Sequence, residues 1–297
     1  MAIESNPWEK ISNYESTELV KRRYKNLFDH TPCTIHAREI TSSFIHGRAY
    51  FEAALTSAAT VKPLLLYYGI SNLTRGLCLM LTQGLRETQL RASHGLQTSE
   101  WKESLNKPNP EFASINVEVL GSGTFIHLYD ATNGQSLLRA NCSVDNLMVE
   151  NEKPKRGNLF SFGDMISRTP CLQGQNRRWG NNTLCFPARH GPTSYEDKGI
   201  RYYHFTKDKF LKNKALIETL FETTNIKYHA ETDDRITYIG SDNVSELPML
   251  TDHLAMSDVA DIWFCTDYSN SMRLSNIMTV FSLSYTLGML VRYYPAQ

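Results

Sequence analysis

The chain has 297 residues, 41% of them hydrophobic and 21% charged, and its 31 basic and 31 acidic residues balance. This composition is that of one large folded domain or two modest ones, and it excludes a disordered or low-complexity chain. No basic segment followed by an apolar one opens the sequence, and the six cysteines are widely spread, so we expect a cytoplasmic protein without a secretory signal.

Charge is unevenly distributed along the chain despite the net charge of zero. Residues 153–214 hold 13 basic and 4 acidic residues, whereas residues 215–270 hold 2 basic and 11 acidic ones. Either the two segments face one another or lie on solvated surfaces, or the first forms a positive surface for a polyanion. The sequence leaves both interpretations open.

The first predicted elements are helices. Residues 15–30 have helical composition, and Pro32 interrupts the pattern. A second helix is predicted to start near Ile40, because Thr41 or Ser42 can serve as its N-cap.

Pro63 suits the first turn of a third helix. One face of this helix is apolar, with Leu66, Ile70, Leu73, Leu77 and Met80 at helical spacing. Another face carries Leu65, Tyr68, Asn72, Arg75 and Leu79. It mixes aromatic, amide and guanidinium groups on an otherwise apolar helix. We expect this second face to contact another helix, a partner chain or a ligand.

The region beyond these helices is predicted to change to strands and loops. Residues 115–120 and 124–130 read as two strands of a hairpin that turns at Gly121–Gly123. Residues 137–151 predict a further strand, and residues 159–172 a short helix.

The later elements alternate between strands and helices. Residues 173–199 are rich in Gly, Asn, Arg and Pro, which predicts a long loop. A strand at 200–206, a helix at 207–223 and a strand at 234–240 follow, and a long helix at 271–293 ends the chain.

The final helix contains an uncharged run, residues 274–291. Several polar residues interrupt this run, which favours a buried core helix over a membrane span. Ser284 and Gly288 lie one turn apart and leave room for close approach of another helix. We therefore predict that the final helix packs back on the N-terminal helices.

Together these elements predict an α+β fold. A mainly helical bundle is formed by the N- and C-terminal segments, residues 1–105 and 271–297. A small antiparallel β insertion lies between them, within a mixed α/β segment of residues 106–270 that includes the basic loop region.

The sequence contains few residues that indicate a catalytic, cofactor-binding or metal-binding site. No glycine-rich phosphate loop, nucleophile elbow or zinc-protease motif occurs, and no close pair of cysteines, so we expect no cofactor and no metal. A metal-independent ribonuclease of the HEPN-like helical type would need a histidine as acid or base beside an arginine on the phosphate. The candidates are His46, Arg48, Arg75 and His94, if the helices bring them together. Each also has an ordinary structural explanation, such as pairing of Arg48 with Glu52.

Cations alternate with aromatic residues between positions 177 and 214. Cations neutralise phosphates and aromatic rings stack on bases, so this composition suits RNA or single-stranded DNA. Solvated lysines around a core strand are the alternative. The candidate contacts are Arg177, Arg178, Trp179, Arg201, Tyr203, Lys207 and Lys209.

Several segments, taken in order, resemble the YaaC-like family of bacterial proteins. These segments are FIHGRAYFEAA, KPLLLYYGISNLTRGLCL, SHGL, LFSFGDMISRTPCL and FSLSYTLGMLVRYYP. They bracket the chain from about residue 40 to residue 295. The resemblance implies the same helical-bundle fold, but the family brings no established reaction and supplies no catalytic residues.

Two functions are therefore expected. The first is a non-catalytic binding or assembly subunit that associates with itself or with a partner protein, away from any membrane, and that contacts nucleic acid if the basic segment forms a surface. Its expected interface residues are Tyr68, Asn72, Arg75, Ser284 and Gly288. The second is the metal-independent ribonuclease. Either would suit host defence, for which no residue argues by itself.

Overall fold

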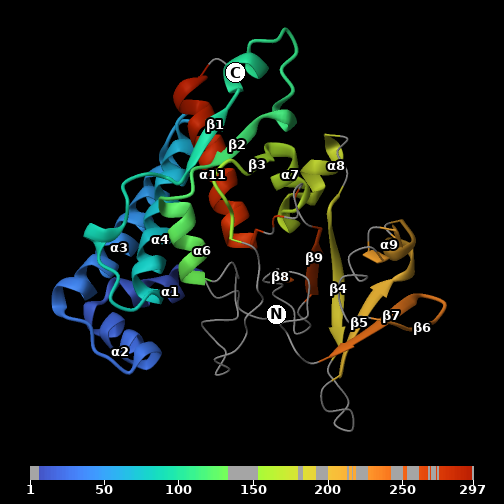
Figure 1. Cartoon of the computed structure of the whole chain (residues 1–297), viewed down its shortest axis with the longest axis horizontal. Coiled ribbons are helices and arrows are strands. Elements are labelled where there is room, and N and C mark those ends of the chain that lie inside the picture. The colour runs from blue at the N-terminus through green and yellow to red at the C-terminus, as the bar shows by residue number, and fades with distance from the viewer. Residues whose placement is uncertain are drawn as a thin grey trace. The chain divides into compact units, whose positions relative to one another are not determined.

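A computed structural model gives the architecture of the chain (Figure 1). It describes residues 7–132, 153–179, 183–191, 200–212, 214–215, 217–218, 227–241, 250–252, 261–266, 268, 272 and 274–295. The chain forms two compact units. The first comprises Met1–Gly134, Lys153–Met165 and Ile277–Gln297, and the second comprises Gln135–Glu152 and Ile166–Asn276.

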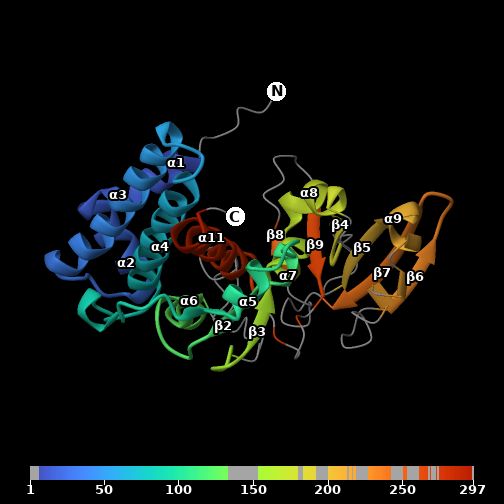
Figure 2. The same ribbon diagram turned by 90° about the horizontal axis from the view of Figure 1, so that it is seen from above.

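The first unit is mainly helical. Its helices are α1 (Pro7–Ile11), α2 (Thr17–Phe28), α3 (Thr34–Thr56), α4 (Lys62–Leu81), α5 (Trp101–Leu105), α6 (Thr124–Thr132), α7 (Phe162–Ser167, which ends just past the boundary) and α11 (Asn276–Tyr293). Helices α3 and α4 lie side by side (Figures 1 and 2). A β-carbon on Gly47 of α3 would lie 2.6 Å from the side chain of Leu73 on α4, so the absence of a side chain permits this close packing.

Helix α3 begins earlier than expected. It starts at Thr34, and Cys33 is its N-cap, with Cys33 Sγ accepting from the His36 backbone N–H at 3.5 Å. The expectation of Thr41 or Ser42 as the cap was wrong. Thr41 Oγ1 donates to the Ala37 carbonyl at 2.7 Å, so this hydroxyl is satisfied within the helix.

Helix α11 packs against α4, as predicted for the final helix. Gly288 lies against Tyr67, and the Tyr67 ring meets the rings of Phe281 and Tyr285 edge-on. Ser284 is buried, and its hydroxyl donates to the Phe281 carbonyl at 2.7 Å.

A three-stranded antiparallel sheet completes the first unit. Its strands are β1 (Leu96–Ser99), β2 (Asn116–Val119) and β3 (Leu159–Ser161), in the order β1-β2-β3. Val117, Val119 and Phe160 are buried, and Trp101 Nε1 donates to the Asn116 carbonyl at 2.5 Å. One side of this sheet therefore belongs to the core of the unit.

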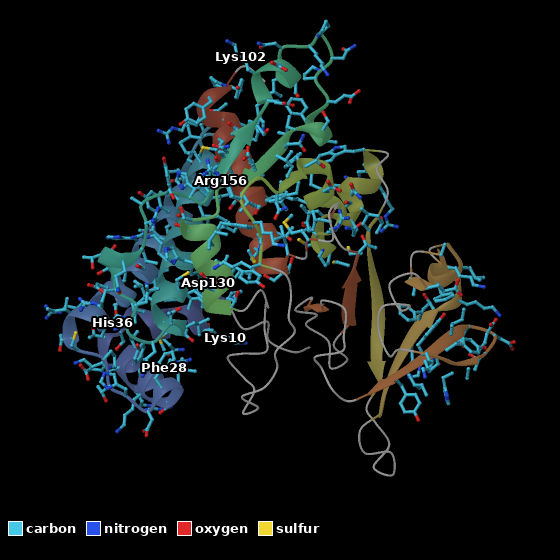
Figure 3. All side chains as sticks on the ribbon, in the orientation of Figure 1. Lys10, Phe28, His36, Lys102, Asp130 and Arg156 are labelled. Carbon is cyan, nitrogen blue, oxygen red and sulfur yellow. The ribbon has the colours of Figure 1, made fainter. Side chains whose placement is uncertain are left out.

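The predicted hairpin between residues 115 and 130 was wrong in its second half. Residues 124–132 form helix α6, in which Phe125, Leu128 and Thr132 are buried at helical spacing, although the β-branched and aromatic residues of this segment favour a strand. Gly123 has a φ of +119° and passes so close to Gly95 that a side chain would not fit. At the far end of α6, Asp130 (Figure 3) pairs with Lys153 at 2.5 Å.

The second unit contains a six-stranded antiparallel sheet with the order β6-β7-β5-β4-β9-β8. Its strands are β4 (Cys185–Gly191), β5 (Ile200–Thr206), β6 (Lys227–Glu231), β7 (Arg235–Ser241), β8 (Leu250–Asp252) and β9 (Asp261–Cys265), and its helices are α8 (Gln173–Arg178) and α9 (Lys207–Lys212). The strands predicted at 200–206 and 234–240 are confirmed. The loop predicted at 173–199 was wrong in part, since it includes α8 and β4, and the strand predicted at 137–151 lies outside the described residues.

The two faces of this sheet differ. Phe205, Ile236 and Tyr238 are buried on one face, where the ring of Phe210 of α9 packs on Phe205 and Tyr238. Tyr202 and His204 alternate with these core positions along β5 and so lie on the other face. The whole chain is therefore an α+β protein in which both ends contribute to a helical bundle and antiparallel β structure lies between them.

Candidate functional site

An aromatic and imidazole cluster lies at the junction of α4 and α11. Tyr67 is fully buried, and its hydroxyl is hydrogen-bonded to Nδ1 of His94. The ring of Tyr285 lies 5.6 Å from the ring of Tyr67 and 5.6 Å from that of His94, measured between centroids. A buried phenol requires a hydrogen-bond partner, and His94 supplies one.

The electrostatics of this cluster favour neutral groups. Burial raises the pKa of Tyr67 far above its ordinary range and the pKa of Tyr285 to about 12. Burial, and secondarily the positive charge of Arg292, lower the pKa of His94. At neutral pH the cluster is thus uncharged, and its hydrogen bond joins a neutral phenol to a neutral imidazole.

Sequence reasoning found His94 but missed Tyr67 and Tyr285. Tyr68, the neighbour of Tyr67, was chosen because it shares a helix face with Asn72 and Arg75. Tyr67 lies on the buried side of α4. From the sequence alone it could not be distinguished from an ordinary core residue. The close approach predicted for Gly288 was the one sequence signal for this junction.

The four candidate catalytic residues each have a separate environment. His46 is exposed on α3, and Arg48 pairs with Glu15 at 2.6 Å and with Glu52 at 3.7 Å. Arg75 pairs with Glu87 at 3.5 Å, and His94 bonds to Tyr67. Within the described parts of the chain, these bonds and ion pairs join no two of the four candidates.

The expected interface residues fall into two groups. Ser284 and Gly288 are buried within the first unit, where they serve the packing of α11 on α4. Tyr68, Asn72 and Arg75 are half-buried on one side of α4. Val61, Leu64 and Leu65 fall on the same side by helical spacing, and we call these six residues the α4 face.

The α4 face is apolar along most of its length. The Tyr68 ring lies 5.6 Å from that of Tyr50 on α3, and Asn72 Nδ2 donates to the Tyr68 carbonyl at 2.8 Å. Among the described residues, α4 is the one helix whose length and composition would suffice to cross a membrane, and this is weak evidence because core helices pass the same test. Of its most apolar stretch, 39% is buried within the chain, and the other residues of α4 are half-buried.

The candidate nucleic-acid residues are distributed over several elements of the second unit. Arg177 and Arg178 end α8, and Trp179 follows with 60% of its surface exposed. Lys207 pairs with Glu231. The backbone places Arg201 and Tyr203 on β5 and Lys209 on α9, but these three side chains lie outside the described part.

Two aromatic groups of the basic segment lie on the face of β5 opposite Phe205 and are half-buried. The rings of Tyr202 and His204 are nearly parallel, with an interplanar angle of 7° and centroids 6.3 Å apart. His229 of β6 meets Tyr202 edge-on. In the portion of the chain with described side chains, no three His, Cys, Asp or Glu residues gather as a metal site.

The chain is an α+β protein built on a helical bundle, and one helix of this bundle, α4, has an apolar face that is only half-buried. A family model described as YaaC-like Protein matches residues 6–297, so the chain belongs to the YaaC-like family. The resemblance drawn from the sequence is thereby confirmed. No curated protein and no solved structure matches the chain.

Proposed function

We propose that the protein is a cytoplasmic, non-catalytic assembly subunit that associates with a second copy of itself through the α4 face. The observation that carries this proposal is the row of half-buried apolar side chains on one side of α4, centred on Tyr68, with Val61 exposed at its start. A contiguous apolar surface on a folded protein is typical of a site of protein association.

The chemistry of the α4 face suits an interface. Leu64, Leu65 and Tyr68 would each lose their remaining exposed surface in the interface. Each loss would favour association by a fraction of the roughly 1.5–3 kcal/mol that full burial of such a side chain provides. Tyrosine and arginine are enriched in interface cores. Asn72 and Arg75 supply polar groups that would fix the orientation of the partner.

A second copy is the partner that the charge balance favours. The chain has 31 basic and 31 acidic residues, so two copies do not repel each other through their net charge. A helix face of this kind can pack on the same face of another copy about a two-fold axis. The α4 faces of two subunits would then cover one another.

Sedimentation equilibrium over a range of protein concentrations tests this proposal. We expect the wild-type protein to dimerise and Tyr68→Glu to remain monomeric with an unchanged circular dichroism spectrum. Leu55→Glu is the matched control, because Leu55 is an apolar residue with 78% exposure on α3 outside the α4 face, and it should still dimerise. A wild-type protein that stays monomeric at every concentration contradicts the proposal.

A second candidate function is contact with single-stranded nucleic acid through the second unit. It is favoured by the exposed indole of Trp179 next to Arg177 and Arg178, a combination that can stack on a base and neutralise phosphates. A gel shift with labelled single-stranded RNA and DNA at low and high salt tests it. Trp179→Ala should weaken a salt-sensitive shift, whereas Tyr293→Ala, which removes a ring of 58% exposure in the first unit, should not.

The alternative of a metal-independent ribonuclease is less well supported. Such a site needs a histidine and an arginine directed at one phosphate. Arg48 and Arg75 are paired with glutamates, and the Nδ1 atom of His94 is bonded to a buried phenol.

A further inference from the structure

Three of the cysteines that the structure describes, Cys171, Cys185 and Cys265, lie in the second unit. Cys185 is the first residue of β4 and Cys265 is the last residue of β9, and the register of these antiparallel strands places the two residues directly opposite each other. Both side chains are buried. The pair lies at the end of the β4–β9 ladder, where local opening requires less free energy than in the middle of a sheet.

The type of strand pairing brings the two sulfur atoms together. The Thr266 backbone N–H donates to the Leu184 carbonyl at 3.1 Å, which makes Cys185 and Cys265 a non-hydrogen-bonded pair of the ladder. In such a pair the Cα atoms are about 4.5 Å apart, and the side chains are at their closest across the strands. A disulfide joins residues whose Cα atoms are about 4.4–6.8 Å apart. A bond between these two sulfur atoms therefore needs little movement of the backbone.

The two thiols already interact in the reduced protein. Cys265 Sγ donates its proton to the Arg168 carbonyl at 3.3 Å. The Cys185 thiol is hydrogen-bonded to Cys265, and because the Cys265 proton is directed to Arg168, Cys185 is the donor in this second bond. This hydrogen bond, together with burial, raises the pKa of Cys185 far above its ordinary value. The thiolate is the reactive form of cysteine, so the buried pair by itself reacts slowly with an oxidant.

Cys171 provides an exposed thiol close to the pair. It lies in the short 3₁₀ helix Pro170–Leu172, and its side chain is exposed. The Leu184 backbone N–H donates to the Ser167 carbonyl at 2.9 Å, which holds the start of β4 against the segment that precedes this helix. The charge of Cys171 acts on Cys185. A small oxidant in solution therefore meets Cys171 before it reaches the buried pair.

We propose that Cys185 and Cys265 form a reversible disulfide in response to small-molecule disulfides such as oxidised glutathione, with Cys171 as the entry thiol. The Cys171 thiolate attacks the small disulfide and releases one half of it as a thiol. The Cys185 thiolate then attacks Cys171 Sγ and releases the second half. Finally the Cys265 thiolate attacks Cys185 Sγ and returns Cys171 to a thiol. The pair loses two electrons and two protons, which reduce the small disulfide to two thiols.

The bond would link two strands that are far apart in the sequence. The chain between Cys185 and Cys265 contains β5, β6, β7 and β8, so the disulfide would close a long loop that includes most of the six-stranded sheet. A cross-link that closes a long loop stabilises a folded unit mainly by restricting its unfolded chain. Disulfides in cytoplasmic proteins are usually transient and redox-sensing, which agrees with the compartment proposed above. Oxidation would therefore convert the second unit to a more stable form.

Peptide mapping by mass spectrometry tests this proposal on the full chain, equilibrated in glutathione buffers of increasing oxidised fraction and quenched by alkylation. We expect a cross-linked peptide that joins Cys185 to Cys265 and that disappears on reduction. Oxidation should raise the melting temperature of the wild-type protein by about 5 °C or more and leave that of Cys185→Ala unchanged. The mapping uses the wild-type protein, so it decides the proposal even if Cys185→Ala does not fold. The proposal is overturned if both residues stay reduced in every buffer, or if the cross-link forms only in urea.

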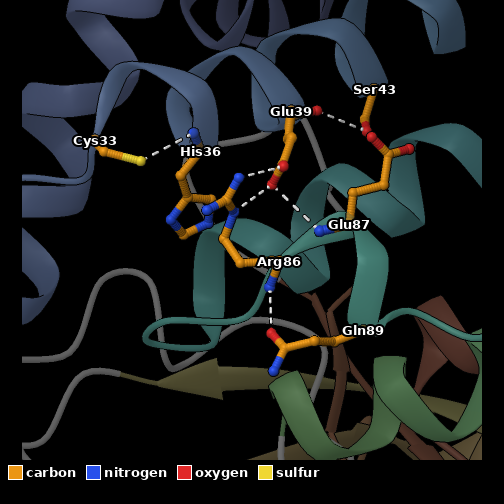
Figure 4. Close-up of polar contacts among 7 residues, drawn as sticks. All are labelled: Cys33, His36, Glu39, Ser43, Arg86, Glu87 and Gln89. Atoms are coloured by element: carbon orange, nitrogen blue, oxygen red, sulfur yellow. Dashed lines mark hydrogen bonds and ion pairs between the residues drawn. The ribbon is translucent and has the colours of Figure 1, made fainter.

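Two serine variants separate the role of Cys171 from that of exposed thiols in general. Cys171→Ser should slow formation of the cross-link about tenfold or more and leave its final yield unchanged. Cys33→Ser is the matched control, because Cys33 is exposed in the first unit. Its Sγ accepts from the His36 backbone N–H at the start of α3 (Figure 4), and serine preserves this cap. Cys33→Ser should oxidise at the wild-type rate, whereas a wild-type rate in Cys171→Ser would contradict the entry role of Cys171.

Discussion

Gly288 of α11 lies so close to Tyr67 of α4 that a β-carbon on the glycine would come within 2.9 Å of Tyr67 Cβ. This contact brings α11 onto α4, and Phe281 and Tyr285 of α11 enclose the Tyr67 ring. The same placement directs the Tyr67 hydroxyl to His94. One missing side chain therefore permits both the helix packing and the buried hydrogen bond.

Gly288→Val should destabilise the first unit. The added methyl groups would overlap Tyr67, and overpacking of this kind costs about 1–3 kcal/mol of unfolding free energy. Urea denaturation measures the loss. Gly174→Ala is the control, because nothing lies within 4 Å of its added carbon, and it should be neutral or slightly stabilising. Equal stability of Gly288→Val and wild type would show that the two helices are not in close contact.

Stability should fall as the pH drops below 6.5, the ordinary pKa of histidine. The pKa of His94 is lowered in the folded protein, so the unfolded chain binds the proton first and unfolding becomes more favourable with acid. The contribution of neutral His94 to the free energy of unfolding is complete above pH 6.5, and it is lost as the pH falls toward the pKa of His94 in the folded protein. His36 and His127 have lowered pKa values for the same main reason, burial, and act in the same direction.

Urea midpoints at several pH values on both sides of 6.5 test the sign of this effect. The variant His94→Asn should lose part of the acid sensitivity and keep the part that belongs to His36 and His127. Identical pH profiles for variant and wild type would mean that His94 titrates normally in the folded protein.

An assembly subunit should not cleave RNA. We expect the purified wild-type protein to leave labelled single-stranded RNA intact in the presence of EDTA. Cleavage that persists in EDTA and disappears in His94→Ala would instead support the ribonuclease alternative. Cleavage that EDTA stops would rule out the metal-independent mechanism.

Arg75→Ala should weaken self-association several-fold and leave the fold intact. The guanidinium lies at the edge of the α4 face, and its ion pair with Glu87 is a partly exposed one worth about 0–1 kcal/mol. The dissociation constant and the melting temperature, measured together, separate the two effects. If neither changes, Arg75 has no role in assembly.

The sequence predicted well those elements whose pattern and packing agree. Helix α4 begins at Lys62 with Pro63 in its first turn, and the strands predicted at 200–206 and 234–240 are β5 and β7. The prediction of a strand at residues 124–130 was wrong because β-branched and aromatic residues favour a strand, whereas packing of Phe125 and Leu128 in the core stabilises a helix. The predicted start of α3 was wrong because the N-cap position is occupied by a cysteine, which is an uncommon N-cap residue.

The candidate sites were less predictable than the fold. Pairing of Arg48 with Glu15 joins residues 33 positions apart, which no local pattern reveals. The cysteine pair of the second unit depends on the register of β4 and β9, which lie side by side only in the folded unit. The α4 face was predictable because helical spacing alone places Tyr68, Asn72 and Arg75 on one side.

Photo-crosslinking from position 68 tests the central claim, self-association through the α4 face, most directly. A benzophenone amino acid in place of Tyr68 should yield a covalent dimer of the purified protein on irradiation, with the cross-link mapped to α4 of the second copy. The same group in place of the exposed Leu55 should yield no such product. Cross-linking that is equal at the two positions, or absent at position 68, would contradict the account.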